Sequence, residues 1–239
     1  AVDTSEAEAQ KGVLAVITFK NAEKLAQYEK DLHPLSTTSI QPVLQSNEVH
    51  YYGEYVGMVV AETFEQAQYA ARLVKYTYEE ATPDIDFEAS KPKAYKPTEQ
   101  SDYSRGDVAS GLEEADVTLD ETYVTPIEHH HPMELHALIG SWNNGNVQAY
   151  ASQQMIDNAA KTIADTFKID KKNVRVMSPY VGGGFGSKLA AKQHVILALM
   201  ASKAVGRPVQ FTVTRTQMFT NTNLRQRNEQ RIQIGAKKD

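Results

Sequence analysis

Hydrophobic and polar residues alternate along the chain in a way that predicts two modules of mixed helices and strands. The β-branched apolar run GVLAVITF is typical of a strand, and QMIDNAAKTIADTF carries apolar residues at helical spacing. Asn21 and Thr63 stand where helix N-caps are expected. The first module is therefore predicted to contain a strand at 12–19, a helix at 21–32, a hairpin or bent strand pair at 50–62, and a helix with a following strand at 63–80.

The second module begins after a segment, 83–106, that has few large apolar residues and several prolines and that we interpret as an extended linker. The asparagine–glycine pair in NNGN predicts a hairpin turn. A helix predicted at 188–206 is apolar around most of its circumference, so we expect it to be buried. Further strands are predicted at 116–126, 134–142, 147–152, 173–178, 207–215 and 229–239, with a helix at 154–167. The alternation as a whole predicts an α+β fold.

Composition narrows the possible chemistry. The chain has 239 residues and a net charge of −5, which disfavours a nucleic-acid partner because phosphate binding needs a basic surface. It has no cysteine, which excludes disulfides, thiolate metal sites and cysteine-ligated iron–sulfur clusters within it. No apolar run has the roughly 20 residues of a membrane helix. The N-terminus lacks the basic and apolar regions of a signal peptide, and a cytoplasmic or a periplasmic location both remain open.

The sequence YVGGGFGSK, between a predicted strand and a predicted helix, contains four glycines interrupted only by Phe185. Glycine leaves the unfolded chain very free, so this concentration implies that something approaches the backbone closely. Amides before a helix suit an anion, but Gly186-Ser187-Lys188-Leu189 does not complete a P-loop, and no glycine falls at Rossmann spacing. A tight turn between a closely packed strand and helix is the alternative. The number of glycines favours a cofactor seat at Gly182, Gly183, Gly184, Phe185 and Gly186.

The stretch TPIEHHHPMELHALIGSW contains three consecutive histidines. In an extended chain His129 and His131 share one face and His130 points away. The chain has no H-E-x-x-H pattern and no cysteine, which weakens the case for a zinc site. A solvated or hydrogen-bonded loop is a second interpretation, and a loop shaped around a cofactor is the one we favour.

Three motifs carry a resemblance to a known family. GGGFGSK, preceded by EHHHPMELHA and followed by RPVQFTVTRTQMF, resembles the molybdenum-binding large subunit of the xanthine dehydrogenase/aldehyde oxidoreductase family. The first module resembles that family's α/β hammerhead domain, and the similarity to bacterial aldehyde oxidoreductases is greatest. The resemblance implies a partial hammerhead domain at 1–82, the extended linker at 83–106, and the N-terminal part of a molybdenum-cofactor-binding domain at 107–239.

This resemblance implies a molybdenum–pterin cofactor, in its cytosine dinucleotide form, with no protein side chain ligating the metal. The glycine loop would then lie against the metal's oxo group, with amides near Phe185 and Gly186 as donors. Glu128 stands where the family often has a glutamine that donates to the oxo ligand, although a shift of one residue would put Ile127 there. Gln154 matches a glutamine near the pterin, or is a polar residue at a helix start.

Two positions bear on the substrate. Leu189 stands where purine-oxidising members carry a glutamate, which favours an apolar or aromatic aldehyde. Arg225 matches an arginine at the family's substrate mouth, where it would stabilise developing negative charge, with a surface residue as the alternative. The family's general base is a glutamate in a motif that no part of this chain matches, so no base is assigned and the chain alone is expected to be inactive.

The resemblance also implies partners: the rest of the large subunit, an iron–sulfur subunit with 2Fe-2S centres, an FAD subunit, and a small aldehyde or heterocycle as substrate. Two other functions are kept as alternatives. One is a non-catalytic binding or assembly module that retains the fold, and the other is a metal-binding domain built on the histidine cluster. No membrane or nucleic-acid partner is expected.

Overall fold

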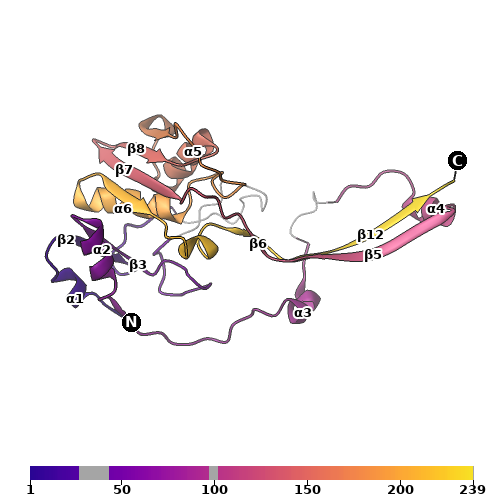
Figure 1. Ribbon diagram of the computed structural model, residues 1–239, viewed down its shortest axis with the longest axis horizontal. Helices are drawn as coiled ribbons and strands as arrows, with labels where there is room; N and C mark the ends of the chain where they lie inside the picture. The colour runs from indigo at the N-terminus through magenta and orange to yellow at the C-terminus, as the bar shows by residue number, and fades with distance from the viewer. Residues whose placement is uncertain (27–42, 97–101, 239) are drawn as a thin grey trace. The chain divides into compact units, whose positions relative to one another are not determined.

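The computed structural model describes residues 1–26, 43–96 and 102–238, and the chain divides into two compact units. Unit 1 contains residues 1–80 and 129–224, and unit 2 contains 81–128 and 225–239. Both helices and strands are present, which confirms the predicted α+β class (Figure 1). The chain passes between the units near residue 80 and at two short strands, β6 (Glu128–His129) and β11 (Leu224–Arg225). Residues 129–224 thus pack in the same unit as the first 80 residues.

A four-stranded sheet in the order β10-β7-β8-β9 forms the centre of unit 1. Its central pair is the predicted hairpin: Leu138 pairs with Ala151 and Asn143 with Asn146, and Asn144 and Gly145 in the turn both have positive φ, as a type I′ turn requires. β9 pairs with β8 in parallel, and β10 pairs with β7 in antiparallel orientation. The strands are β7 (Ala137–Asn143), β8 (Asn146–Ala151), β9 (Val174–Met177) and β10 (Val209–Thr212).

Two helices, α5 (Ile156–Phe167) and α6 (Gln193–Val205), complete the core of unit 1. α6 runs alongside β7 (Figure 1), and every residue from Gln193 to Ser202 is buried, which confirms the predicted burial. The indole N–H of Trp142 on β7 donates to the Leu199 carbonyl at 2.8 Å, and the Trp142 ring meets Phe167 of α5 edge-on. Strand β7 and helices α5 and α6 therefore pack together in one apolar core.

The N-terminal part of unit 1 is a strand pair covered by two helices. One side of the pair contributes Val16 to a small cluster with Ala7 and Ala70, while Ile17 packs into the core with α6. Thr63 forms the predicted N-cap as a full capping box with Gln66. The elements are β1 (Val2–Asp3), α1 (Ser5–Glu8), β2 (Val13–Thr18), β3 (Gly57–Ala61), α2 (Phe64–Ala71) and β4 (Lys75–Tyr76); β2 pairs with β3 and β1 with β4.

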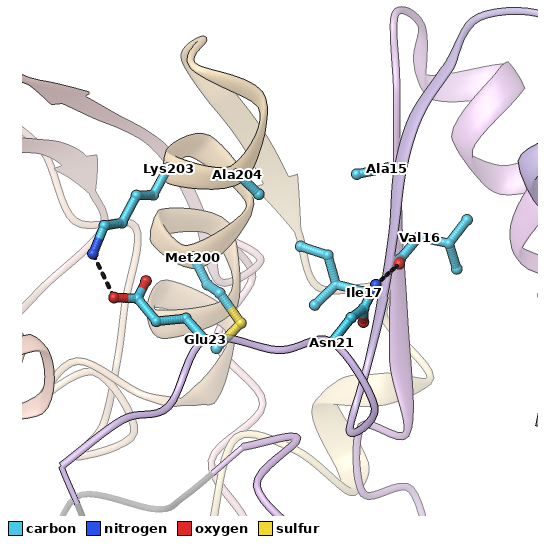
Figure 2. A pocket seen from close by; sticks show the side chains of 8 residues that line it. All are labelled: Ala15, Val16, Ile17, Asn21, Glu23, Met200, Lys203 and Ala204. Carbon is cyan, nitrogen blue, oxygen red and sulfur yellow. Dashed lines mark hydrogen bonds and ion pairs between the residues drawn. The ribbon is translucent and has the colours of Figure 1, made fainter.

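A shallow cavity of about 270 Å³ lies between β2 and α6. Figure 2 shows its wall: Lys203 of α6 forms an ion pair with Glu23, and the Asn21 amide donates to the Val16 carbonyl. The other lining residues are small or apolar. Its polar groups are thus already paired with one another.

Unit 2 is built on a ribbon of two long antiparallel strands, β5 (Val117–Thr125) and β12 (Asn228–Ala236), paired along nine residues. The predicted linker is extended in part but also contains a short helix, which the Asp86 carboxylate caps by accepting the Ala89 amide. None of the described residues of unit 2 is buried. The remaining elements are α3 (Phe87–Ser90), the 3₁₀ turn Lys91–Lys93 and α4 (Val108–Glu113).

Three predicted elements differ from the structure. Residues 21–26 are not helical, because the Asn21 side chain folds back onto Thr18 and Val16; the rest of the helix predicted at 21–32 lies outside the described residues. The segment 50–62 gives one strand, β3, and not a hairpin. The helix predicted from 188 begins at Gln193, because residue 188 is held in the core by other contacts. Within the described ranges, no helix has the length and apolar character needed to cross a membrane.

Candidate functional site: the glycine loop and its two anchors

The glycine loop follows β9 and has an unusual backbone. Gly183, Phe185 and Gly186 all have positive φ, at 96°, 53° and 105°. A positive φ is unfavourable for a residue with a side chain, so Phe185 is held there by its surroundings. The Phe185 side chain is nevertheless 65% exposed. The loop therefore combines a constrained backbone with an aromatic ring turned outward.

Glu134 anchors the first half of the loop. Its Oε2 accepts the Gly182 amide at 2.8 Å and the Lys188 ammonium at 2.6 Å, and it also accepts the Ser152 hydroxyl. Its backbone amide donates to the Gly182 carbonyl at 3.3 Å. Partial burial raises the pKa of the Glu134 carboxyl, but the hydrogen bonds from Lys188, Ser152 and Gly182 outweigh it, so the pKa lies below its usual range. Glu134 is therefore a carboxylate at neutral pH.

Gln154 anchors the second half. Its side-chain Oε1 accepts the backbone amides of Gly186 and Lys188, each at 3.1 Å. The backbone amide of Gln154 donates to the Lys188 carbonyl at 2.8 Å. The Gly186 amide, which the family resemblance assigned to an oxo ligand, is thus engaged with Gln154 in this structure. Ser187 closes the turn between the anchors by donating its hydroxyl to the Gly184 carbonyl at 2.8 Å.

The anchors explain two of the glycines. A Cβ on Gly182 would lie 2.7 Å from the Glu134 Cβ, and a Cβ on Gly184 would lie 2.4 Å from the Gln154 Oε1. The groups that approach this backbone so closely are therefore side chains of the same chain. The loop is also separated from the N-terminus of α6 by residues 187–192, so its amides are not part of a helix-terminus anion site.

The histidine segment lies against the glycine loop. A Cβ on Gly183 would be 3.3 Å from the Pro132 Cβ. The rings of His129 and His131 both meet Phe219 edge-on, with centroids 5.2 and 4.0 Å apart, so the two alternate histidines do share a neighbour. That neighbour is an aromatic ring. Among the described residues no group of three or more potential ligand residues could hold a metal ion, and the histidine cluster has no geometric support as a metal site.

Arg215, in the motif RPVQFTVTRTQMF, connects that motif to the histidine segment and the glycine loop. Its guanidinium donates to the Pro132 carbonyl at 2.8 Å and to the Met133 carbonyl at 2.7 Å. Pro132 touches the glycine loop, and the neighbouring Glu134 anchors it. The three motifs, which are separated by tens of residues in sequence, therefore meet in one place in unit 1.

Comparison with known proteins shows the family of the chain. Residues 1–82 match the aldehyde oxidase and xanthine dehydrogenase a/b hammerhead domain, and residues 89–239 match the molybdopterin cofactor-binding domain. The chain belongs to the molybdopterin cofactor-binding domain family. It is 37% identical to the aldehyde oxidoreductase molybdenum-binding subunit PaoC of Escherichia coli K12, over 99% of this chain and 31% of that protein. It is 30% identical to a subunit of a probable xanthine dehydrogenase of Bacillus subtilis, over 98% of this chain and 32% of that protein.

Solved structures show the same fold. The aldehyde oxidoreductase from Desulfovibrio gigas matches with a TM-score of 0.82 and 23% identity, over 99% of this chain and 28% of that one. The quinoline 2-oxidoreductase from Pseudomonas putida 86 matches with a TM-score of 0.79 and 22% identity, over 99% and 32%. The chain spans about a third of the length of the curated relatives it matches.

The residues of this molybdopterin cofactor-binding domain fit a group bound through shape, backbone and aromatic contacts. Large apolar or aromatic side chains are exposed on the loop and on the adjoining histidine segment, with Phe185 65%, Tyr180 86% and Met133 88% exposed. The Nδ1 of His129 is buried and has no hydrogen-bond partner among the described residues, which leaves it for a polar edge of a ligand.

Two of the predicted site residues lie outside unit 1, which contains the glycine loop. Glu128 and Arg225 belong to unit 2, where both are exposed. Leu189 directly follows the anchored Lys188, is partly buried, and its carbonyl accepts the Asn158 amide at 3.0 Å. The roles of Glu128 and Arg225 therefore remain predictions from the family resemblance.

Sequence reasoning missed the residues that hold the loop. From the sequence alone, Lys188 is notable only because the residues around it do not complete a P-loop. Glu134 is only a carboxylate close to the predicted site. A weak signal was present, because Lys188 lies two residues after the last glycine, at the start of the largely apolar stretch 188–206, and a lysine that is buried there needs a polar partner. Arg215 lies within a recognised motif, but its contact with the histidine segment has no signature in the local sequence.

Proposed function

We propose that this chain forms part of the cofactor pocket and substrate mouth of a molybdenum hydroxylase large subunit. The observation that carries the proposal is the meeting of the three motifs: Glu134 accepts the Gly182 amide, and Pro132 lies against Gly183. Arg215 binds the carbonyls of Pro132 and Met133. The bound cofactor would supply two-electron oxidation chemistry at its metal. The chain's own residues hold the glycine loop in a fixed conformation and present Phe185 on its exposed side.

The reaction proposed is the oxidation of an aldehyde to a carboxylic acid, or the hydroxylation of an N-heterocycle, with water as the source of oxygen. For an aldehyde, water adds one oxygen, and two electrons and two protons leave to an acceptor. The relatives named above include an aldehyde oxidoreductase and a probable xanthine dehydrogenase, and Leu189 favours the aldehyde because an apolar side chain cannot bind a purine's polar edge.

The form of the cofactor, the partner subunits and the roles of single residues are proposed from the same family resemblance. The cofactor is proposed in its cytosine dinucleotide form, and 2Fe-2S and FAD centres on partner subunits would accept the electrons. Glu128 and Arg225 are proposed at the oxo ligand and the substrate mouth. Gln154, together with Gly182, Gly183, Gly184, Phe185 and Gly186, is proposed to line the cofactor. No residue of this chain is proposed as the general base.

The test is turnover of the protein purified with its natural partners. Aromatic aldehydes and purines are compared as substrates under argon, with a dye as electron acceptor. We expect aldehyde-dependent dye reduction without oxygen, and purine turnover at least tenfold lower, because a buried polar edge left unpaired is strongly disfavoured. Oxidation that requires dissolved oxygen, or purines preferred over aldehydes, would contradict the proposal.

A further inference from the structure

The ion pair between Lys188 and Glu134 has no role in the chemistry just described. The Lys188 side chain is fully buried, and its ammonium is held by the Glu134 carboxylate at 2.6 Å, the Glu134 carbonyl at 3.3 Å and the Ser152 hydroxyl at 2.9 Å. A fully buried lysine is rare, because taking an ammonium out of water is expensive unless it is paired and hydrogen-bonded. Here all three of its donors have an acceptor.

The position of this pair gives it influence over the loop. Lys188 is bound at both ends: its ammonium reaches the anchor of Gly182, and its backbone amide and carbonyl are both bound by Gln154, the anchor of Gly186. The loop from 182 to 186 is thus closed into a ring of contacts whose common member is Lys188. If the ammonium leaves Glu134, the two anchors are no longer joined.

The backbone of the loop needs such a constraint. Phe185 has a positive φ although it carries a side chain, and its ring is largely exposed, so burial of the ring does not hold it there. A strained conformation persists only where surrounding contacts fix it. Glu134, Gln154 and Ser187 are among the residues that make such contacts with the loop on either side of Phe185.

We propose that Lys188, Glu134 and Ser152 form a buried lock that holds the glycine loop in its final conformation before any cofactor binds. They are positioning residues, since none has been placed in contact with the reacting atoms. The purpose of the lock, retention of the molybdenum–pterin group, rests on the proposed function, but the preorganised loop does not. A loop fixed in advance loses less freedom when a ligand binds, and binding is tighter for that reason.

Hydrogen exchange of backbone amides tests the lock directly, on the full-length protein with and without added cofactor. The variants are Lys188→Met, which keeps the length of the side chain and removes its charge, and Glu134→Gln, which leaves the buried ammonium without its carboxylate. Lys161→Met is the matched control, because Lys161 forms an exposed ion pair with Asp165 on α5 of the same unit. The double variant Glu134→Gln/Lys188→Met guards against a failure to fold, since it leaves no unpaired buried charge.

We expect exchange across 182–188 to become roughly tenfold or more faster in each lock variant that folds, because a charge-assisted hydrogen bond is lost from the closed loop. Exchange in α5 and in β7 should be unchanged, and the Lys161→Met control should match the wild type throughout. Protein prepared with cofactor should also lose molybdenum several-fold faster during dialysis when the lock is broken.

Two results would overturn the proposal. One is exchange that accelerates equally in the loop and in the sheet, which would mean that the pair stabilises unit 1 as a whole. The other is a loop whose protection is unchanged in both single variants. If no preparation contains molybdenum but the loop loses protection selectively, the lock stands and the proposed function fails.

Discussion

Replacing Gly184 with alanine tests whether Gln154 is the reason for that glycine. The new Cβ would lie 2.4 Å from Oε1 and 2.6 Å from Cδ of Gln154, so the Gln154 side chain would have to move. Moving it breaks the two hydrogen bonds from the amides of Gly186 and Lys188, each worth about 1 kcal/mol. Loss of the glycine's freedom in the unfolded chain returns about 0.5 kcal/mol. The expected net destabilisation is about 1.5 kcal/mol.

The size of this effect depends on Gln154 in a way that a general packing defect would not. Gln154→Ala alone loses the same two bonds and should cost about 2 kcal/mol. In the double variant the Cβ has room, so the total should be about 1.5 kcal/mol and not the sum of about 3.5 kcal/mol. Urea unfolding followed by the fluorescence of Trp142 measures this, since Trp142 is the only tryptophan in the sequence and packs against the core of unit 1.

Gly111→Ala is the control, because a Cβ there meets nothing within 4 Å and the residue lies on α4 of unit 2. Its unfolding curve at Trp142 should match the wild type. Additive losses in the double variant, or a Gly184→Ala protein as stable as the wild type, would refute the assignment of Gln154 as the anchor.

Three further predictions concern other contacts of unit 1. Burial lowers the pKa of His136 to about 4, and the positive charges of Lys188, His130 and Lys192 act in the same direction. Burial also lowers the pKa of His194 to about 3, with a further contribution from His136. The unfolded chain takes up these protons near pH 6.5, so stability present above pH 6.5 should be lost as the pH falls towards 4, by about 3 kcal/mol for His136; an unfolding free energy that is flat between pH 4.5 and 7 would contradict this. Arg215→Met should lower stability by about 1 kcal/mol and speed amide exchange in 130–134, and Arg215→Lys should not restore protection, because lysine lacks the fork that reaches two carbonyls; full rescue by lysine would show that charge alone suffices. Thr63→Ala should cost about 1 kcal/mol in urea unfolding through loss of the capping box, whereas Thr63→Ser should be close to wild type; equal losses in the two variants would rule out the cap as the cause.

The local elements of the fold were predictable where short-range chemistry decides them. The NNGN turn, the Thr63 cap and the apolar helix α6 each follow from residues within a few positions of one another. Asn21 is the instructive exception. It is a good N-cap residue, but its side chain satisfies the backbone of β2 instead, and the residues that follow it up to 26 are not helical.

The candidate site was predictable in its location and not in its contacts. The local density of glycines and histidines singled out the two segments that the structure brings together, although side chains of the same chain account for two of the glycines. The anchors depend on pairs such as Glu134 with Lys188, 54 residues apart, and Arg215 with Pro132, 83 residues apart. Pairing over such distances is set by the sheet that places β7 beside β8 and β10, and no local pattern specifies it.

The central claim is that the glycine loop and the histidine segment form the seat of a molybdenum–pterin group. The most direct measurement is the amount of molybdenum and of released pterin per chain in the purified full-length protein, compared with a Gly183→Val variant. Gly183 has a φ of 96° and a Cβ there would lie 3.3 Å from Phe185 and Pro132, so valine should distort the seat. We predict close to one molybdenum and one pterin per chain in the wild type and a loss of both in the variant. A fully folded wild type with neither, prepared from cells supplied with molybdate, would contradict the account.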